Sequence, residues 1–222
     1  MHRPQPGRYL TVSTTDEAFQ AHASVSPSAP GLITNATLRL PKGTVVALDA
    51  EGDGFFSGDT GFATKAQLDS EVGSGTYTFN IFTVNDGTNK PALTIPADNY
   101  PATPTIANLN DATGVEHSLD FNLFWNTYTN GTTNDFIVLS LSDTNGDDVF
   151  ASGGILETNS LNGTNTSVLI PGGTLEASAN YEGRLLFVKR TQTNTNSIPG
   201  ATGIAGFFKE TTFSVSTLPD ET

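Results

Sequence analysis

The chain has 222 residues, which is enough for one large domain or two of about 100 residues each. The chain contains 10 Lys and Arg and 23 Asp and Glu, which gives a net charge of -13. This charge would repel a phosphate backbone, so nucleic-acid binding is not expected. The absence of Cys excludes a disulfide framework and a thiolate metal site. No apolar run approaches the roughly 20 residues of a membrane-spanning helix, so no membrane insertion is expected.

The composition is typical of an exported β-protein. Charged residues make up only 15% of the chain, and it holds 22 Gly and 12 Pro besides abundant Thr, Asn and Ser. Many bacterial surface modules lack disulfides, whereas small secreted animal domains usually depend on them. The polar start of the chain does not resemble a signal peptide. We therefore expect an extracellular or cell-surface fragment whose export signal has been removed.

Alternation of apolar and polar residues predicts strands in the first half. Residues 35–40 alternate, and so do residues 76–84, where the alternation changes phase after Ile81 and so predicts a β-bulge. Between these runs, Thr64 is a candidate N-cap for one helical turn over residues 64–69.

A proline-rich stretch, residues 96–104, separates the two halves. Proline removes backbone donors and favours an extended chain, which suits a short, semi-rigid linker. The sequence therefore predicts two domains, residues 1–98 and 99–222.

The second half contains further alternating runs. Residues 119–125 would direct Leu119, Phe121, Leu123 and Trp125 inward. Other strands are predicted at residues 136–141, 167–170, 181–188 and 211–217. Tight turns are predicted at Asp86-Gly87, Asn130-Gly131, Asn145-Gly146 and Asn162-Gly163, because these dipeptides accept positive φ. Short strands joined by turns argue for antiparallel sandwiches over a parallel sheet.

Trp125 ends one of these runs, and Leu175 precedes Tyr181 by six residues at the start of another. This pattern resembles a fibronectin type III or immunoglobulin-like β-sandwich, in which the Tyr hydroxyl bonds back to backbone at a corner. Leu68 and Tyr77 form a weaker echo in the first half. The resemblance implies an all-β fold of two antiparallel β-sandwich modules in tandem, of a kind that spaces, binds or adheres.

Few residues suit catalysis. The three histidines, His2, His22 and His117, are expected to be solvated surface residues, and no Gly-x-Ser-x-Gly elbow occurs. Paired carboxylates could serve glycoside hydrolysis. Glu51 with Asp53, and Glu157 with Asp147, are nominal pairs of this kind.

An acidic turn offers hard oxygen donors close together, namely Asp143, Asn145, Asp147 and Asp148. Two interpretations stay open: an Asx-rich hairpin turn, or a weak extracellular Ca²⁺ site that lacks the closing Glu of an EF-hand. Residues 49–54 form a second loop of this type. Apart from Ca²⁺, no cofactor is expected.

Aromatic residues are the other candidates for ligand contact, because sugars stack on exposed rings. Adjacent Phe residues on a strand point to opposite faces, so one of each pair should face outward or cap the end of a sheet, and two Tyr residues fall in linker or loop contexts. The speculative ligand-binding residues are Phe55, Phe56, Tyr100, Tyr128, Phe207 and Phe208. Packing at a sheet edge explains them equally well.

These observations favour a non-enzymatic pair of β-sandwich modules from a larger exported protein, acting as an adhesion, spacer or carbohydrate-binding accessory module. Its expected partner is a glycan or a protein surface. A secreted hydrolase that acts on a polysaccharide through paired carboxylates is one alternative. A self-associating structural repeat of a surface layer or filament is another.

Overall fold

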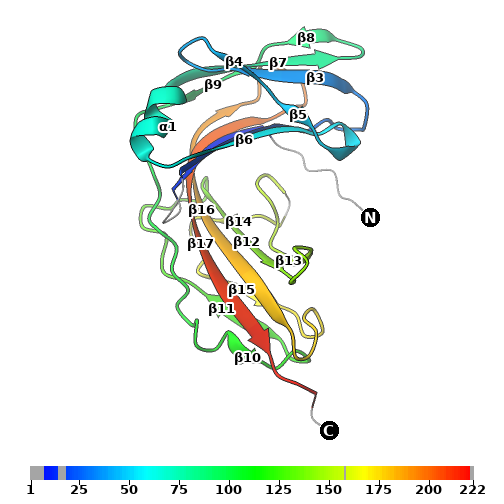
Figure 1. The fold of residues 1–222 in the computed structure, drawn as a ribbon, viewed down its shortest axis with the longest axis vertical. Helices are drawn as coiled ribbons and strands as arrows, with labels where there is room; N and C mark the ends of the chain where they lie inside the picture. The colour runs from blue at the N-terminus through cyan, green and yellow to red at the C-terminus, as the bar shows by residue number, and fades with distance from the viewer. Residues whose placement is uncertain (1–7, 15–18, 158, 221–222) are drawn as a thin grey trace. The chain divides into compact units, whose positions relative to one another are not determined.

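The computed structural model describes residues 8–14, 19–157 and 159–220 (Figure 1). Its one α-helix is α1 (Lys65–Glu71), and a 3-10 turn, η1, spans Gly52–Gly54. The strands are β1 (Arg8–Thr14), β2 (Phe19–Val25), β3 (Ile33–Arg39), β4 (Val45–Ala47), β5 (Asp49–Ala50), β6 (Phe56–Phe62), β7 (Gly75–Thr83), β8 (Gly87–Asn89), β9 (Ala92–Ile95), β10 (Thr113–Val115), β11 (Phe121–Phe124), β12 (Phe136–Ser142), β13 (Asp148–Ala151), β14 (Leu161–Asn162), β15 (Ser167–Ile170), β16 (Asn180–Asn194) and β17 (Gly203–Thr217). The predicted all-β fold class is confirmed.

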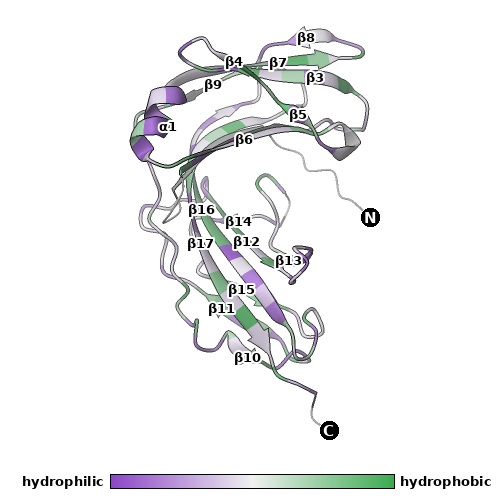
Figure 2. Cartoon of the chain, in the orientation of Figure 1, coloured by the Kyte–Doolittle hydropathy of each residue, from purple (hydrophilic) through white to green (hydrophobic). Residues whose placement is uncertain are grey.

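Apolar residues gather on the strands, as on β7, whereas much of α1 is hydrophilic (Figure 2). Among the described residues, no helix has the length and apolar character needed to cross a membrane.

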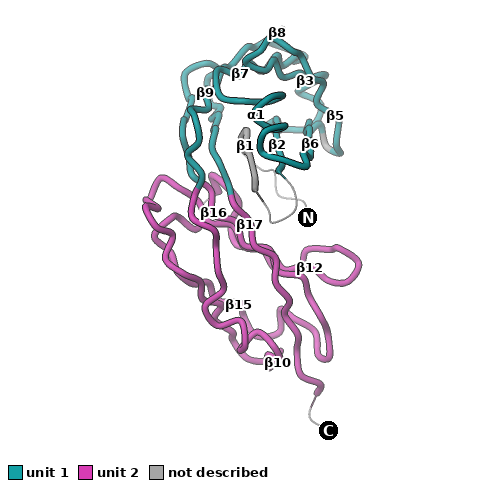
Figure 3. The backbone as a smooth tube through the Cα atoms, turned by 60° about the vertical axis from the view of Figure 1, so that its left-hand side comes forward, with its two compact units in different colours: residues 1–100, 189–208 teal, residues 101–188, 209–222 magenta. Residues whose placement is uncertain are grey.

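The chain divides into two compact units (Figure 3). Unit 1 comprises residues 1–100 and 189–208, and unit 2 comprises residues 101–188 and 209–222. The chain passes from one unit to the other between Tyr100 and Pro101, inside β16 and inside β17. This division differs from the predicted domains in the placement of residues 189–208, because Ala205 and Phe207 pack into the core of unit 1.

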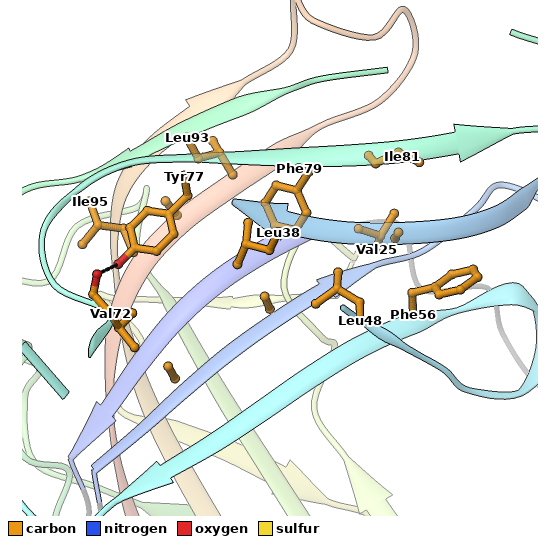
Figure 4. Close-up of a cluster of buried hydrophobic side chains, with 14 of the residues drawn as sticks. Val25, Leu38, Leu48, Phe56, Val72, Tyr77, Phe79, Ile81, Leu93 and Ile95 are labelled. Carbon is orange, nitrogen blue, oxygen red and sulfur yellow. Dashed lines mark hydrogen bonds between the residues drawn. The ribbon is translucent and has the colours of Figure 1, made fainter. Parts of the chain in front are cut away.

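Unit 1 has two sheets with its core between them. In one sheet, β4, β3, β7 and β8 are neighbours in that order and β9 also pairs with β7; in the other, β1, β2, β6 and β5 follow one another. Tyr77, Phe79 and Ile81 are at most 1% exposed and pack against apolar residues of both sheets (Figure 4).

The bulge predicted after Ile81 is wrong for β7. Phe82 and Val84 are 37% and 61% exposed, so the apolar phase changes because these side chains face outward. The register shift lies on β3, between Ile33 and Asn35.

The predicted helical turn is α1, and its start follows from local hydrogen bonds. The Thr64 hydroxyl accepts from Gln67 N, and the Gln67 side chain accepts from Thr64 N, each at 3.2 Å. This capping box satisfies two backbone donors that a helix start leaves free. Leu68, the buried residue of the helix, packs into the core of unit 1 and so anchors α1 there.

Unit 2 also packs two sheets around one core. In the larger sheet, β13, β12, β16 and β17 are neighbours, β14 pairs with β12 and β10 pairs in parallel with β17; in the smaller sheet, β11 pairs with β15. Trp125 is 3% exposed, and its indole N–H donates to Asn165 O at 2.9 Å. The inward phase of Leu123 and Trp125 is confirmed. Leu119 is 63% exposed, contrary to prediction, because β11 begins only at Phe121.

Each unit has a tyrosine whose hydroxyl bonds to backbone a few residues earlier. Tyr181 Oη accepts from Glu176 N at 2.7 Å. Tyr77 Oη donates to Val72 O at 3.0 Å and also contacts Gly73 O (Figure 4). The fold is therefore that of immunoglobulin-like and fibronectin type III-like β-sandwiches, as the resemblance implied.

Replacing Trp125 with Ala should lower the free energy of unfolding by about 3–5 kcal/mol, because the change leaves a cavity in a closed core. Urea unfolding followed by circular dichroism measures the loss. Leu119→Ala is the matched control and should stay within about 0.5 kcal/mol of the parent, since Leu119 is exposed. Equal stability of Trp125→Ala and the parent would contradict this packing.

The independent folding of residues 1–98 stays a prediction, and the core composition argues against it. A fragment of residues 1–98 lacks Ala205 and Phe207, so it should show no cooperative urea transition. A fragment of residues 99–222 retains every core residue of unit 2 and should unfold cooperatively, as reported by Trp125 fluorescence. Cooperative unfolding of residues 1–98 alone would restore the division drawn from the sequence.

Candidate functional site

An open cleft of about 430 Å³ lies in unit 1 beside α1. Its walls are one side of α1, residues 73–74, residues 95–98, Tyr100 and Phe207. The capping box fixes the start of the helix, and residues 96–100 follow directly on β9, whose backbone pairs with β7.

Lys65 forms an ionic cluster at this cleft. Its Nζ lies 2.6 Å from Asp69 Oδ2 and 2.8 Å from Asp98 Oδ2. The same Nζ is 5.9 Å from the centre of the Tyr100 ring, within cation–π range. The hydrogen bonds to Asp69 and then Asp98 raise the pKa of Lys65 above its usual value, so it stays an ammonium ion at neutral pH. The cluster thus ties α1 to the segment after β9.

Tyr100 forms the aromatic wall of the cleft. Its ring centre lies 4.7 Å from that of Phe207, with the planes tilted by 59°. Burial, opposed by the Lys65 charge, raises the pKa of Tyr100 to about 12. The hydroxyl therefore stays protonated at neutral pH and can donate a hydrogen bond.

The cleft combines an aromatic ring, two carboxylates and an ammonium ion, which suits hydrogen bonding to hydroxyl groups beside a stacking surface. It is poorly arranged for glycoside hydrolysis, which needs a sugar between its two carboxyl groups. Here Lys65 Nζ is within hydrogen-bond distance of both Asp69 and Asp98.

The structure places the predicted aromatic residues in different environments. Phe56, Tyr128, Phe207 and Phe208 are 2–7% exposed, and Phe55 and Tyr100 are half-buried. The Tyr128 ring stacks on Phe187 at 4.7 Å. The expectation that one of Phe207 and Phe208 faces outward is wrong, because both faces of β17 are covered from Gly203 to Phe208. Only Tyr100 and Phe207 of this set line the cleft.

Lys65, Asp69 and Asp98 are site residues that were not predicted from the sequence. A signal for the first two was present, because Lys65 and Asp69 are four residues apart on the predicted helical turn and so share a face. Nothing in the sequence indicated that Asp98 would complete the cluster.

The predicted acidic turn closes the hairpin of β12 and β13. Asp143 Oδ1 accepts from Asn145 N at 2.8 Å and from Asp147 N at 3.0 Å. Asp148 Oδ1 accepts from the Ser142 hydroxyl at 2.8 Å. The bond from Asp147 N, together with those from Asn145, lowers the pKa of Asp143. Gly146 supplies the positive φ of 87° that the turn requires.

The other candidate groups also take part in local contacts. Glu157 Oε2 accepts from Gly154 N at 2.8 Å, and Glu51 Oε1 accepts from the Ser57 hydroxyl at 3.2 Å. The His22 and His117 side chains are 20% and 22% exposed, so they are less solvated than predicted.

Each of these histidines lies beside a carboxylate. His22 is 2.6 Å from Asp59, and His117 is 2.9 Å from Asp220. His2 and the Asp53 side chain lie outside the described residues. Within the described part of the chain, no three or more His, Asp or Glu side chains gather in a way that could hold a metal ion.

A Ca²⁺ site at Asp143, Asn145, Asp147 and Asp148 stays one of two interpretations, and we predict the other, an ordinary hairpin turn. We expect the same thermal midpoint in millimolar Ca²⁺ and in chelator, because backbone donors already engage Asp143 Oδ1. Thermal unfolding of the parent and of Asp147→Asn tests this. A midpoint raised by Ca²⁺ in the parent alone would establish the site.

No family model and no curated protein matches the chain. Similar solved structures include the BSP domain of a biofilm-associated protein, with 17% identity, a TM-score of 0.26, and coverage of 99% of this chain and 30% of that one. Chicken CNTN1 FN1-FN3 domains share 8% identity at a TM-score of 0.31, covering 97% and 68%. A 1.5-MDa bacterial ice-binding adhesin shares 11% identity at a TM-score of 0.27, covering 97% and 66%.

The chain thus spans about a third of the first structure's length and about two thirds of the other two. Likenesses at these TM-scores carry no argument about function. The fold assignment rests on the sheets and the two tyrosine corners.

Proposed function

We propose that the chain is a non-enzymatic part of a larger exported protein and serves as an adhesion and spacer unit at a cell surface. The observation that carries this proposal is the threefold passage of the chain between its units. The core of unit 1 contains residues from the 189–208 stretch, so each unit is built from two separate stretches of sequence. Local unfolding of one stretch therefore cannot detach a whole unit. This build suits a spacer that must stay folded outside the cell without disulfides.

The hydrogen bonds and ion pairs of the ionisable residues support a non-enzymatic role. Asp143 and Glu157 accept hydrogen bonds from backbone N–H groups of their own turns. Lys65 is an ammonium ion between two carboxylates rather than a free base. These groups hold loops in place, which is a structural use of charge.

Carbohydrate binding is a second function that one feature favours, the cleft beside α1. Tyr100 offers a half-buried ring, and Asp69 and Asp98 are 49% and 60% exposed and can accept hydrogen bonds from sugar hydroxyls. Sugar binding commonly combines an apolar stacking surface with a few placed polar groups, as ligand pockets in general do.

A glycan array probed with the full chain tests the carbohydrate role. Tyr100→Ala should weaken binding about tenfold or more, equivalent to about 1.4 kcal/mol, because the stacking surface is lost. Tyr100→Phe keeps the ring and should retain most of the affinity. Phe82→Ala, at an exposed aromatic residue of the same unit outside the cleft, should bind like the parent.

The array result also separates the proposed functions. Binding that survives Tyr100→Ala would place the glycan elsewhere, and no binding at all would leave the spacer role alone. Release of reducing sugar from a polysaccharide, abolished by Asp98→Asn, would instead establish the hydrolase and overturn the non-enzymatic assignment.

A further inference from the structure

Strand β15 leaves one edge of the smaller sheet of unit 2 open. Trp125 N donates to Thr166 O at 3.0 Å, so this pair is hydrogen-bonded and every second pair along β11 and β15 is hydrogen-bonded as well. Backbone groups of alternate residues point to opposite sides of a strand, so those of Ser167 and Leu169 point away from β11. Within the described residues, no group bonds to the N–H or C=O of either residue.

The opposite edge of the same sheet is closed. On β11, Phe124 N donates to Asn108 Oδ1 at 2.9 Å, and Asn108 Nδ2 donates to Asn122 O at 2.9 Å. Ala107 N donates to Phe124 O at 2.8 Å. The loop before β10 therefore satisfies the outer groups of β11, whereas β15 has no such cover.

The open edge is also apolar and uncharged. Leu169 and Phe124 are both 45% exposed and lie diagonally on the outer face of the sheet, and Val168 is half-buried at the rim of the core. The sequence between Glu157 and Glu176 contains no charged residue. Two other edges carry carboxylates, Asp49 on β5 and Asp148 on β13, whereas the edge strands β4 and β8 are uncharged like β15. Charge on an edge strand discourages pairing, and β15 lacks it.

We propose that β15 pairs antiparallel with β15 of a second copy of this chain, forming a two-fold symmetric dimer. A chain with a net charge of -13 repels its own copies, so a contact between copies is most favourable where both surfaces are neutral. The open edge of β15 is such a neutral surface, and its hydrogen-bonding pattern is self-complementary.

The register follows from the geometry. With the two-fold axis at Val168, Ser167 of each copy faces Leu169 of the other, and both pairs exchange their N–H and C=O bonds. The Val168 side chains of the two copies then meet directly, which buries their half-exposed surface. Pro171 lacks an N–H and ends the paired stretch, so the contact is short and the dimer reversible.

Sedimentation velocity of the full chain over a micromolar to millimolar range tests the dimer. The dimer fraction should rise with concentration and with added salt, because salt screens the repulsion between the acidic copies. Hydrogen exchange at the Ser167 and Leu169 amides should slow as the dimer forms.

Two variants test whether the open edge of β15 forms the contact. Leu169→Lys places two like charges diagonally across the contact, and Ser167→Pro removes an N–H that β11 does not use; each should weaken dimerisation at least tenfold. Val84→Lys is the control, because it changes a 61% exposed apolar residue in unit 1 and should leave the dimer intact. Thermal unfolding verifies that each variant is folded.

The proposal would be overturned by a monomer at every concentration and salt level, by a dimer that both edge variants leave unchanged, or by a dimer in which the Ser167 and Leu169 amides exchange as fast as in the monomer. Weakening by Val84→Lys equal to that by Leu169→Lys would also overturn it, since it would show a general effect of charge.

Discussion

The packing of Phe207 into unit 1 is the contact on which both the fold and the cleft depend. Phe207 lies far along the chain, on β17, yet it is 3% exposed in a core built mainly from residues before Tyr100. The same ring contacts Tyr100 and lines the cleft. Burying one aromatic ring therefore closes the first core and positions the wall of the candidate site. It also makes the folding of unit 1 depend on residues 189–208, which follow most of unit 2 in the sequence.

Local patterns in the sequence predicted local structure well, for physical reasons. Thr64 and Gln67 satisfy each other's backbone donors, so the helix start could be read from two residues. Tyr181 follows Leu175 at a spacing that lets its hydroxyl reach Glu176 N, and Trp125 has the phase of a core residue. Each feature depends on neighbours within a few positions or on a period of two, and both are visible in one sequence.

Features that depend on distant partners could not be predicted in this way. Both Phe207 and Phe208 are buried because other segments cover both faces of β17, and alternation along one strand carries no information about that cover. The cleft needs Lys65 and Asp98 together, and their contact depends on the position of the segment after β9 beside α1 rather than on sequence spacing. Leu119 was predicted to face inward for the opposite reason, since the alternation in the sequence begins before Phe121, where the paired strand starts.

The acidity of the chain has a different effect at each place where it is concentrated. At the tip of β12 and β13, Asp143 is bonded by backbone N–H groups, so its charge stabilises a turn. Beside α1, Asp69 and Asp98 hold one ammonium ion. Carboxylates on β5 and β13 protect strand edges from pairing. The stretch between Glu157 and Glu176 combines the absence of charged residues with the open hydrogen-bonding groups of β15. Repulsion over the rest of the surface then selects the geometry of self-association, because approaches that bring acidic edges together are disfavoured while the approach through β15 is not.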